Sequence, residues 1–357
     1  LAAGGTITTG SNSLLVGADG TAGAPGEGGF GTGGDGGAGG EGRTAGGRVL
    51  FEATTANGRT GELNLGFTGI SASGDDAGRV VIGGDGRTTF ADLSVSVTGV
   101  AAPTAGNLDT ATTGILLAPT GAGSIATTGD MRLTTDGSVG IYAAGGGHVA
   151  VGGTLDIAAG DQIDLRHATP AAGGAPTIAA VGNATLTAAN GITGDAGSTA
   201  ASDAALALTS TNGSIAIGSA RAGGDMALSA VNGSIGTSGI IAAGDDMRIT
   251  AASMALGRIE ATGSGTDSEA DGANIVLTST GAATVVHAEA AGNFTANVGS
   301  FATGLNSIVT GGDIVVASPG TVDLGNSSAG GFVSVNGQSI AFNTVSAGSF
   351  VSLTAEG

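Results

Sequence analysis

GGDMALSAVNGSIG (Gly223–Gly236) decides the fold of this chain, because each part of it has a place in a coil of β-structure. Met226 and Leu228 are apolar residues at alternate positions, and such alternation predicts a strand with one buried face. An Asn-Gly pair accepts the backbone conformation of a tight corner at little cost, so Asn232-Gly233 predicts a turn. The unit is thus a Gly-Asp turn, a strand, a corner and a second strand.

Related units recur along the sequence. GDMRLTTDGSVG spans Gly129–Gly140, LALTSTNGSIAIG spans Leu206–Gly218, and GDDMRITA spans Gly244–Ala251. In the second half of the chain, apolar runs begin at nearly regular intervals, with one longer interval after Met247, near Leu206, Met226, Met247, Ile275, Phe294, Ile314, Phe332 and Phe350. A fixed period of about 20 residues that is carried by β-formers predicts a β-solenoid, in which stacked coils share one core.

We therefore expect an all-β fold, a right-handed parallel β-solenoid (β-helix) with about 20 residues per rung. The repeat predicts a single solenoid domain over residues 1–357, because a solenoid lengthens along one axis without forming separate cores. The handedness follows from the right-handed crossover that parallel strands prefer.

Polar stretches predict loops that leave this solenoid. Residues 17–47 are rich in glycine, and Phe30 is their only sizeable apolar residue, so they predict an insertion loop. An ordered stack of extended glycine helices is the alternative for this stretch. Gly263–Gly272 (GSGTDSEADG) fills the one long interval and predicts a minor loop, and proline predicts two more at Ala101–Asn107 and His167–Pro176.

Composition narrows the functional classes. The formal net charge is −19, with ten Arg and no Lys, and nucleic-acid binding needs clustered cations, so we expect no nucleic-acid partner. The same charge disfavours docking on an anionic membrane. No run of eighteen apolar residues occurs, so we also expect no membrane insertion.

The chain contains no cysteine, which excludes disulfides and thiolate metal sites. This absence suits a bacterial protein that crosses two membranes unfolded and folds outside the cell. The sequence shows no initiator methionine, signal peptide or anchoring segment, and we interpret it as an internal piece of a larger protein.

The repeats also resemble a known family. GGDMALSAVNGSI and AAGDDMRITA are similar to repeats of filamentous haemagglutinin-like adhesins, the large exoproteins of two-partner secretion, and to passenger repeats of autotransporter adhesins. The resemblance covers Met131–Gly357 well and the part of the chain before Met131 loosely. The family's secretion motif does not appear as such, since Asn190-Gly191-Ile192 lies inside an ordinary rung. The resemblance implies a shaft on the surface of a Gram-negative bacterium.

One segment has the composition of a candidate catalytic site. Solenoid enzymes that cleave glycosidic bonds need two or three acids within reach of the bond. The only crowded candidate is Asp161–His167 (DQIDLRH), in which Asp164 and Arg166 share one strand face. The chain lacks Lys and has 3% aromatic residues, so a solvated strand face is the simpler interpretation. We therefore predict no catalytic residues and no enzyme.

Metal and cofactor sites are also not expected. Gly83–Phe90 (GGDGRTTF) approaches the calcium-binding nonapeptide of RTX proteins, but Thr88 replaces its aspartate. Acidic pairs offer oxygen ligands for calcium, at Asp75-Asp76 and Asp245-Asp246, and this alternative stays open. The three histidines have no metal-ligand spacing, at His148, His167 and His287.

Two phenylalanines suggest a contact surface. In FVSV (Phe332–Val335) and FVSL (Phe350–Leu353), alternation places either the phenylalanine or the following valine inside. If the valines stack inside, Phe332 and Phe350 face outward one rung apart and form a candidate contact patch. The alternative buries both rings in a wider part of the core.

These observations predict a non-catalytic structural shaft of a large secreted adhesin or exoprotein at the bacterial cell surface. Its partners would be neighbouring repeats of the same polypeptide, or identical subunits end to end, and a host or bacterial surface receptor. The first alternative is a subunit of a self-assembling extracellular filament. The second is a carbohydrate-active β-helix enzyme.

Overall fold

The computed structural model describes the greater part of the chain, namely residues 2–3, 6–8, 14–19, 48–54, 61–73, 79–98, 113–168, 177–263, 272–303 and 307–356. The elements of these residues are all β-strands, and the strand pairs described are parallel. Within the same ranges no helix has the length and hydropathy to cross a membrane. The chain divides into two compact units, Leu1–Ala200 and Ala201–Gly357, and each is a β-solenoid stack.

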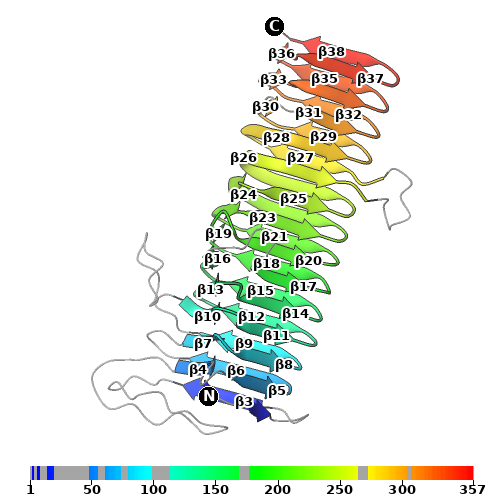
Figure 1. Cartoon of the computed structure of the whole chain (residues 1–357). Helices are drawn as coiled ribbons and strands as arrows, with labels where there is room; N and C mark the ends of the chain where they lie inside the picture. The colour runs from blue at the N-terminus through cyan, green and yellow to red at the C-terminus, as the bar shows by residue number, and fades with distance from the viewer. Residues whose placement is uncertain are drawn as a thin grey trace. The chain divides into compact units, whose positions relative to one another are not determined.

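The strands of the first unit follow one another with short turns between most of them (Figure 1). They are β1 (Ala2–Ala3), β2 (Thr6–Thr8), β3 (Leu14–Asp19), β4 (Arg48–Ala53), β5 (Glu62–Leu65), β6 (Thr68–Ser73), β7 (Arg79–Gly84), β8 (Arg87–Phe90), β9 (Leu93–Val97), β10 (Thr113–Pro119), β11 (Ser124–Thr127), β12 (Met131–Thr135), β13 (Ser138–Ala144), β14 (His148–Val151), β15 (Leu155–Ala159), β16 (Gln162–Ala168), β17 (Ile178–Ala180), β18 (Ala184–Ala188) and β19 (Gly191–Gly194). The next strand, β20 (Thr199–Ser202), crosses the division.

The second unit continues the same plan. Its strands are β21 (Leu206–Ser210), β22 (Ser214–Ile217), β23 (Ser219–Ala222), β24 (Met226–Thr237), β25 (Ile240–Ala243), β26 (Met247–Ala261), β27 (Ile275–Ser279), β28 (Ala282–Ala290), β29 (Phe294–Asn297), β30 (Ser300–Thr303), β31 (Ser307–Thr310), β32 (Ile314–Ala317), β33 (Thr321–Asp323), β34 (Asn326–Ala329), β35 (Val333–Gly337), β36 (Ser339–Ala341), β37 (Thr344–Ala347) and β38 (Val351–Ala355).

Register within the second unit confirms the predicted repeat. Residues at one equivalent position of successive coils are Leu206, Met226, Met247, Ile275, Phe294, Ile314, Val333 and Val351. The spacing stays close to the predicted period, except for the longer step from Met247 to Ile275, which includes the minor loop. The last two positions are Val333 and Val351, one residue after the phenylalanines near which the predicted runs begin, and this register is one of the two arrangements considered for FVSV and FVSL.

Coils of the first unit are longer than predicted. Strands β3, β6, β9, β12, β15 and β18 form one column, in which Met131 lies between Leu93 and Leu155. The steps from Met131 to Leu155 and from Leu155 to Ala184 both exceed the predicted period. Successive coils of the chain are roughly 22 residues apart, close to the predicted period, and the first unit has the longer coils.

The core of each unit is narrow and aliphatic. Inward positions alternate with outward ones along each strand, as in β12, where Met131 and Leu133 are buried and Arg132 is exposed. Aromatic rings enter the core in two places, as pairs of Phe51 with Phe90 and of Phe294 with Phe301. Each coil thus buries its apolar face against the coils before and after it.

The predicted loops are only partly within the described residues. The glycine-rich insertion begins later than predicted, because Gly17–Asp19 belong to β3 and pair with β6, while residues 20–47 lie outside the described ranges. Residues 264–271 of the minor loop also lie outside them, and β26 and β27 on either side stack in register. His167 belongs to β16, which corrects the start of the loop expected there. Ala101–Asn107 is not described, and a single domain over 1–357 stays a prediction.

Glycine is concentrated at corners where successive coils approach closely. A Cβ atom at Gly223 or Gly330 would lie closer than 3.0 Å to a backbone carbonyl oxygen of the preceding coil, at Asp203 or Gly311. Real Cβ atoms essentially never come so near. The absence of a side chain at these corners therefore permits the short spacing between coils.

Candidate functional site

The side chain of Asp164, in the acid-rich segment of β16, contacts residues on the coils before and after its own in the first unit. Asp164 is 3% exposed. Its Oδ2 accepts a hydrogen bond from Tyr142 Oη at 3.0 Å and forms an ion pair with Arg166 Nε at 2.7 Å, and its Oδ1 accepts a hydrogen bond from Thr193 Oγ1 at 3.3 Å. Tyr142 belongs to the coil before, on β13, and Thr193 to the coil after, on β19. Both carboxylate oxygens are thus held by protein donors.

Asp161, at the start of the same segment, makes a second bridge of this kind. It is 5% exposed, and its Oδ2 accepts a hydrogen bond from Ser138 Oγ at 2.7 Å. Its Oδ1 accepts a hydrogen bond from Asn190 Nδ2 at 3.0 Å. Ser138 and Asn190 lie on the coils before and after it. This geometry favours a structural role for both acids, since a catalytic carboxylate needs an oxygen that faces the substrate.

Tyr142 lies beside Asp164, and the negative charge of Asp164 affects the pKa of Tyr142. The guanidinium carbon of Arg166 is 5.0 Å from the centre of the Tyr142 ring, within the range of a cation–π contact. Burial raises the pKa of Tyr142 to about 12, and the charge of Asp164 and its hydrogen bond act in the same direction. The positive charges of Arg166 and Arg79 oppose this shift.

Alkaline titration should show this shift directly, because Tyr142 is the only tyrosine and the chain has no tryptophan. We expect the ultraviolet absorbance of tyrosinate to appear with a midpoint at a pKa of about 12, above the ordinary value of about 10. Asp164→Asn should move the midpoint back toward the ordinary value.

Asp156→Asn is the matched control, since Asp156 pairs with Arg132 at a half-buried, outward position of β15. It should leave the midpoint unchanged. The raised pKa means that the folded state holds the Tyr142 proton more tightly than the unfolded state does. The stability that this difference gives the fold is fully present below pH ~10 and is lost as the pH approaches 12. A wild-type midpoint near the ordinary value, with circular dichroism still that of the folded chain, would contradict the burial of Tyr142.

Asp and Asn side chains form a ladder along one corner of the second unit. We define the corner ladder as the residues directly before β26, β27, β29 and β32, which are Asp246, Asn274, Asn293 and Asp313. Each side-chain Oδ1 accepts a hydrogen bond from the backbone N–H at the same position of the next coil, at 2.8 to 2.9 Å. The last of these bonds runs from the N–H of Phe332 to Asp313.

The first unit has a shorter counterpart of this ladder. Asp92 Oδ1 accepts from Asp130 N at 2.8 Å, and Asp130 Oδ1 accepts from Thr154 N at 2.7 Å. The hydrogen bond from Thr154 lowers the pKa of Asp130 below its ordinary value. The contribution of this carboxylate to stability is therefore present above the ordinary pKa and is lost as the pH falls through the lowered one.

This ladder was not predicted from the sequence, where the aspartates were interpreted as turn residues. Its signal is the recurrence of Asp or Asn directly before an apolar run, as in Asp246-Met247 and Asn293-Phe294. A corner interrupts the strand ladder, and a buried or half-buried N–H there needs an acceptor. Short Asx side chains supply it.

Asn293→Ala should lower the free energy of unfolding by about 0.5–1.5 kcal/mol, because the N–H of Asp313 loses its acceptor. Asn293→Asp keeps a side-chain oxygen at this position and should cost less. Asn297→Ala is the control on the same strand, since Asn297 is exposed, and it should cost almost nothing. Urea unfolding gives the free energy of unfolding of each of the three variants. Equal losses for Asn293→Ala and Asn297→Ala would show that the ladder contributes nothing.

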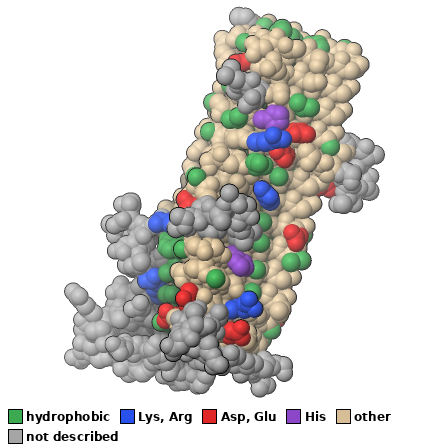
Figure 2. All heavy atoms as spheres, viewed as in Figure 1, with side chains coloured by type: hydrophobic (Ala, Val, Ile, Leu, Met, Phe, Trp, Pro, Cys, Tyr) green, Lys and Arg blue, Asp and Glu red, His purple; other side chains and the backbone are tan. Residues whose placement is uncertain are grey.

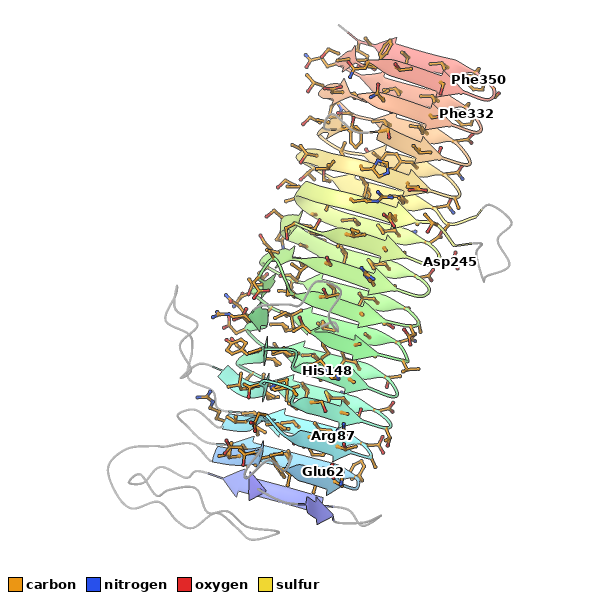
Figure 3. All side chains as sticks on the ribbon, viewed as in Figure 1. Glu62, Arg87, His148, Asp245, Phe332 and Phe350 are labelled. Atoms are coloured by element: carbon orange, nitrogen blue, oxygen red, sulfur yellow. The ribbon has the colours of Figure 1, made fainter. Side chains whose placement is uncertain are left out.

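Phe332 and Phe350 occupy the next two positions of the corner ladder. They lie directly before β35 and β38, and their rings stack with centroids 5.0 Å apart and planes 5° apart (Figure 3). Val333 is buried and is the register partner of Val351, and Phe350 is 54% exposed. The structure therefore has the outward arrangement of the two phenylalanines. Their role as a contact patch stays a prediction.

Of the two acidic pairs considered for calcium, the structure describes Asp245-Asp246. Asp245 is 4% exposed, and Asp246 Oδ1 accepts bonds from both the backbone and the side-chain nitrogen of Asn274. Thr88 of the glycine-rich motif is buried in β8. Asp75-Asp76 lies outside the described residues. In the described part of the chain, no three His, Asp or Glu side chains form a group that could hold a metal ion.

The histidines lie on separate strands. His148 on β14 is half-buried, in an outward column with Glu62 and Arg87 (Figure 3). His287 on β28 has its Nε2 3.8 Å from Glu289 Oε2, which also pairs with Arg258. Figure 2 shows that such charged side chains are sparse on the visible face. His167 belongs to β16, and its side chain is not described.

A scan of the chain against protein-family models finds no match, and neither a search of curated proteins nor a search of solved structures finds one.

Proposed function

We propose that this chain is part of the non-catalytic shaft of a large secreted bacterial exoprotein of the adhesin type, exposed at the cell surface. The observation that carries the proposal is the use of polar side chains within each unit. Asp161, Asp164 and the corner ladder all join one coil to the next. A chain that uses its polar groups for contacts between coils is suited to bearing load along the stack.

Two features of the sequence support the same proposal. The absence of cysteine suits export through two membranes in an unfolded state, and the repeats resemble those of filamentous haemagglutinin-like and autotransporter adhesins. The net charge of −19 favours solubility of the secreted protein. Attachment to a host or bacterial receptor would then belong to another part of the protein, or to a patch such as Phe332 and Phe350.

Antibodies raised against the purified chain test the location. Intact producing cells and their culture medium should both react with the antibody, without permeabilisation. An antibody against a periplasmic protein is the control and should label only permeabilised cells. Labelling of this chain only after permeabilisation would contradict a surface shaft.

A further inference from the structure

Asn-Gly pairs are open to one self-modification, in which the backbone nitrogen of the glycine attacks the side chain of the asparagine. Glycine has no Cβ atom to hinder this approach, and its backbone adopts unusual conformations easily. The sequence contains five such pairs, and four of them lie in the described part of the chain: Asn190-Gly191, Asn212-Gly213, Asn232-Gly233 and Asn336-Gly337. The fold holds these four pairs in different ways, so the structure indicates which of them reacts.

Asn212-Gly213 is the only one of these four pairs that lies entirely between strands, in the corner that joins β21 to β22. Asn212 is exposed, and among the residues that the structure describes its side chain has no hydrogen-bond partner. The N–H of Gly213 donates to the Oγ of Ser210, in the same turn, at 3.1 Å. The side-chain amide of Asn212 and the backbone nitrogen of Gly213 are therefore not held by a neighbouring coil.

Asn232-Gly233 stands at the same position of the next coil, in the same local sequence Asn-Gly-Ser, and is held more firmly. Both of its residues belong to β24. Asn232 Nδ2 donates to the backbone oxygen of Thr211 at 2.9 Å. The backbone nitrogen of Ser234 and its Oγ lie 3.0 Å and 3.1 Å from the Oγ of Ser214. Attack would require the side-chain amide and the peptide group to leave this arrangement, so the bonds to the preceding coil would have to break first.

The other two pairs are fixed as well. Asn190 donates through its backbone nitrogen to Asp161 O at 2.8 Å and through Nδ2 to Asp161 Oδ1 at 3.0 Å. Asp161 is 5% exposed, so Asn190 is anchored to a buried group. Asn336 and Gly337 both lie within β35, and both have register partners in β38. Among the described pairs, Asn212-Gly213 alone has the freedom that the reaction needs.

We propose that Asn212-Gly213 is a site of self-modification, at which Asn212 of the folded chain becomes aspartate and isoaspartate. The Gly213 nitrogen gives its proton to hydroxide and bonds to Cγ of Asn212, and the bond from Cγ to Nδ2 breaks. Nδ2 takes a proton from water and leaves as ammonia, and a succinimide ring remains. Water then adds to either carbonyl of the ring and opens it. Water and hydroxide are the only co-reactants, so the reaction needs neither an oxidant nor an enzyme.

The fold can accept both products at this corner. Each product adds a negative charge, and the residue at the same position of the next coil, Asn232, is uncharged. Isoaspartate also lengthens the backbone by one carbon atom, but the corner lies outside β21 and β22, and both strands keep their partners in β24. Modified chains should therefore stay folded, and the modified fraction should increase with the age of the protein. This inference depends on local geometry and does not require the proposed function.

Peptide mapping by mass spectrometry tests the proposal on the purified chain, incubated for increasing times at mildly alkaline pH. In the folded chain, the amide of Asn212 should become a carboxyl group several times faster than those of Asn190, Asn232 and Asn336, and the product should include isoaspartate. In a sample unfolded in urea the four asparagines should react at similar rates, because each is followed by glycine. Circular dichroism verifies that the first sample remains folded.

Gly213→Ala should slow the reaction of Asn212 severalfold, because the new Cβ atom hinders the attacking nitrogen, and it should leave the slower rate at Asn232 unchanged. Equal rates at Asn212 and Asn232 in the folded wild-type chain would overturn the proposal. So would a product at Asn212 that contains aspartate alone, because direct hydrolysis of the amide yields no isoaspartate. Either result leaves the surface location of the protein unaffected, since the antibody experiment does not depend on this reaction.

Discussion

Phe294→Ala should lower the free energy of unfolding by about 3–5 kcal/mol, the largest loss that we expect for a single substitution in this chain. Phe294 is fully buried, and it lies between Ile275 and Ile314 of the neighbouring coils. Its ring is also 5.8 Å from that of Phe301. The backbone ladders hold the coils at a fixed spacing, so the surrounding side chains cannot collapse fully into the cavity.

The control for this variant is Phe350→Ala. Phe350 stands one position earlier in its coil, directly before β38, and is 54% exposed. Its removal should cost less than about 1 kcal/mol, because little apolar surface leaves the core. Urea unfolding followed by far-ultraviolet circular dichroism compares the two, with the slope of each transition showing whether unfolding remains cooperative. Equal losses would mean that the inward and outward positions are assigned wrongly.

Gly223→Ala should destabilise the chain by about 1–3 kcal/mol, because its new Cβ atom would be forced against the carbonyl oxygen of Asp203 in the preceding coil. The obstacle is backbone, and it cannot rotate away as a side chain would. The corner must therefore widen, which weakens the hydrogen bond from Gly223 N to Ser202 O, now 2.9 Å long.

The neighbouring residue provides the control. A Cβ atom at Gly224 would have its nearest neighbour at 3.7 Å, which is an ordinary van der Waals distance. Gly224→Ala should therefore be neutral, or stabilise the chain by about 0.4–1 kcal/mol by restricting the unfolded state. Thermal unfolding of the two variants side by side measures the difference. If Gly224→Ala lost as much as Gly223→Ala, the close approach at the corner would not be the cause.

Local sequence patterns predicted the fold class because the fold repeats one local unit. Alternation in Met226–Ser229 identifies a strand, the Asn-Gly pair identifies a corner, and repetition supplies the partner strand. This reasoning held where coils are of nearly equal length. In the first unit the coils are somewhat longer than this period, as in the step from Met131 to Leu155, because no fixed interval is visible in that part of the sequence.

The contacts that join the coils could not be predicted in this way. In FVSV and FVSL the two alternating faces are both apolar, so only register with the coil before shows that Val333 is inside and Phe332 is outside. Asp161 bonds with Ser138 and Asn190 on neighbouring coils, and unequal coil lengths hide such pairings in the sequence. Without register, an acid of this kind resembles a catalytic candidate as much as a structural bridge.

Parallel register between coils is the central claim, and a pair of introduced cysteines tests it most directly, since the chain has none of its own. Thr250 on β26 and Thr278 on β27 are register partners on the outward face. Adjacent strands are ~4.8 Å apart, and disulfides need Cα atoms about 4.4–6.8 Å apart. The double variant Thr250→Cys/Thr278→Cys should therefore form an intramolecular disulfide on mild oxidation, detected by mass spectrometry of a non-reduced digest.

Thr250→Cys/Val276→Cys places the second cysteine on the same face but two positions out of register, and it should form little disulfide. Rapid oxidation of the first pair alone is the result that we predict. No disulfide in the first pair, or equal oxidation of both, would contradict the stacked coils.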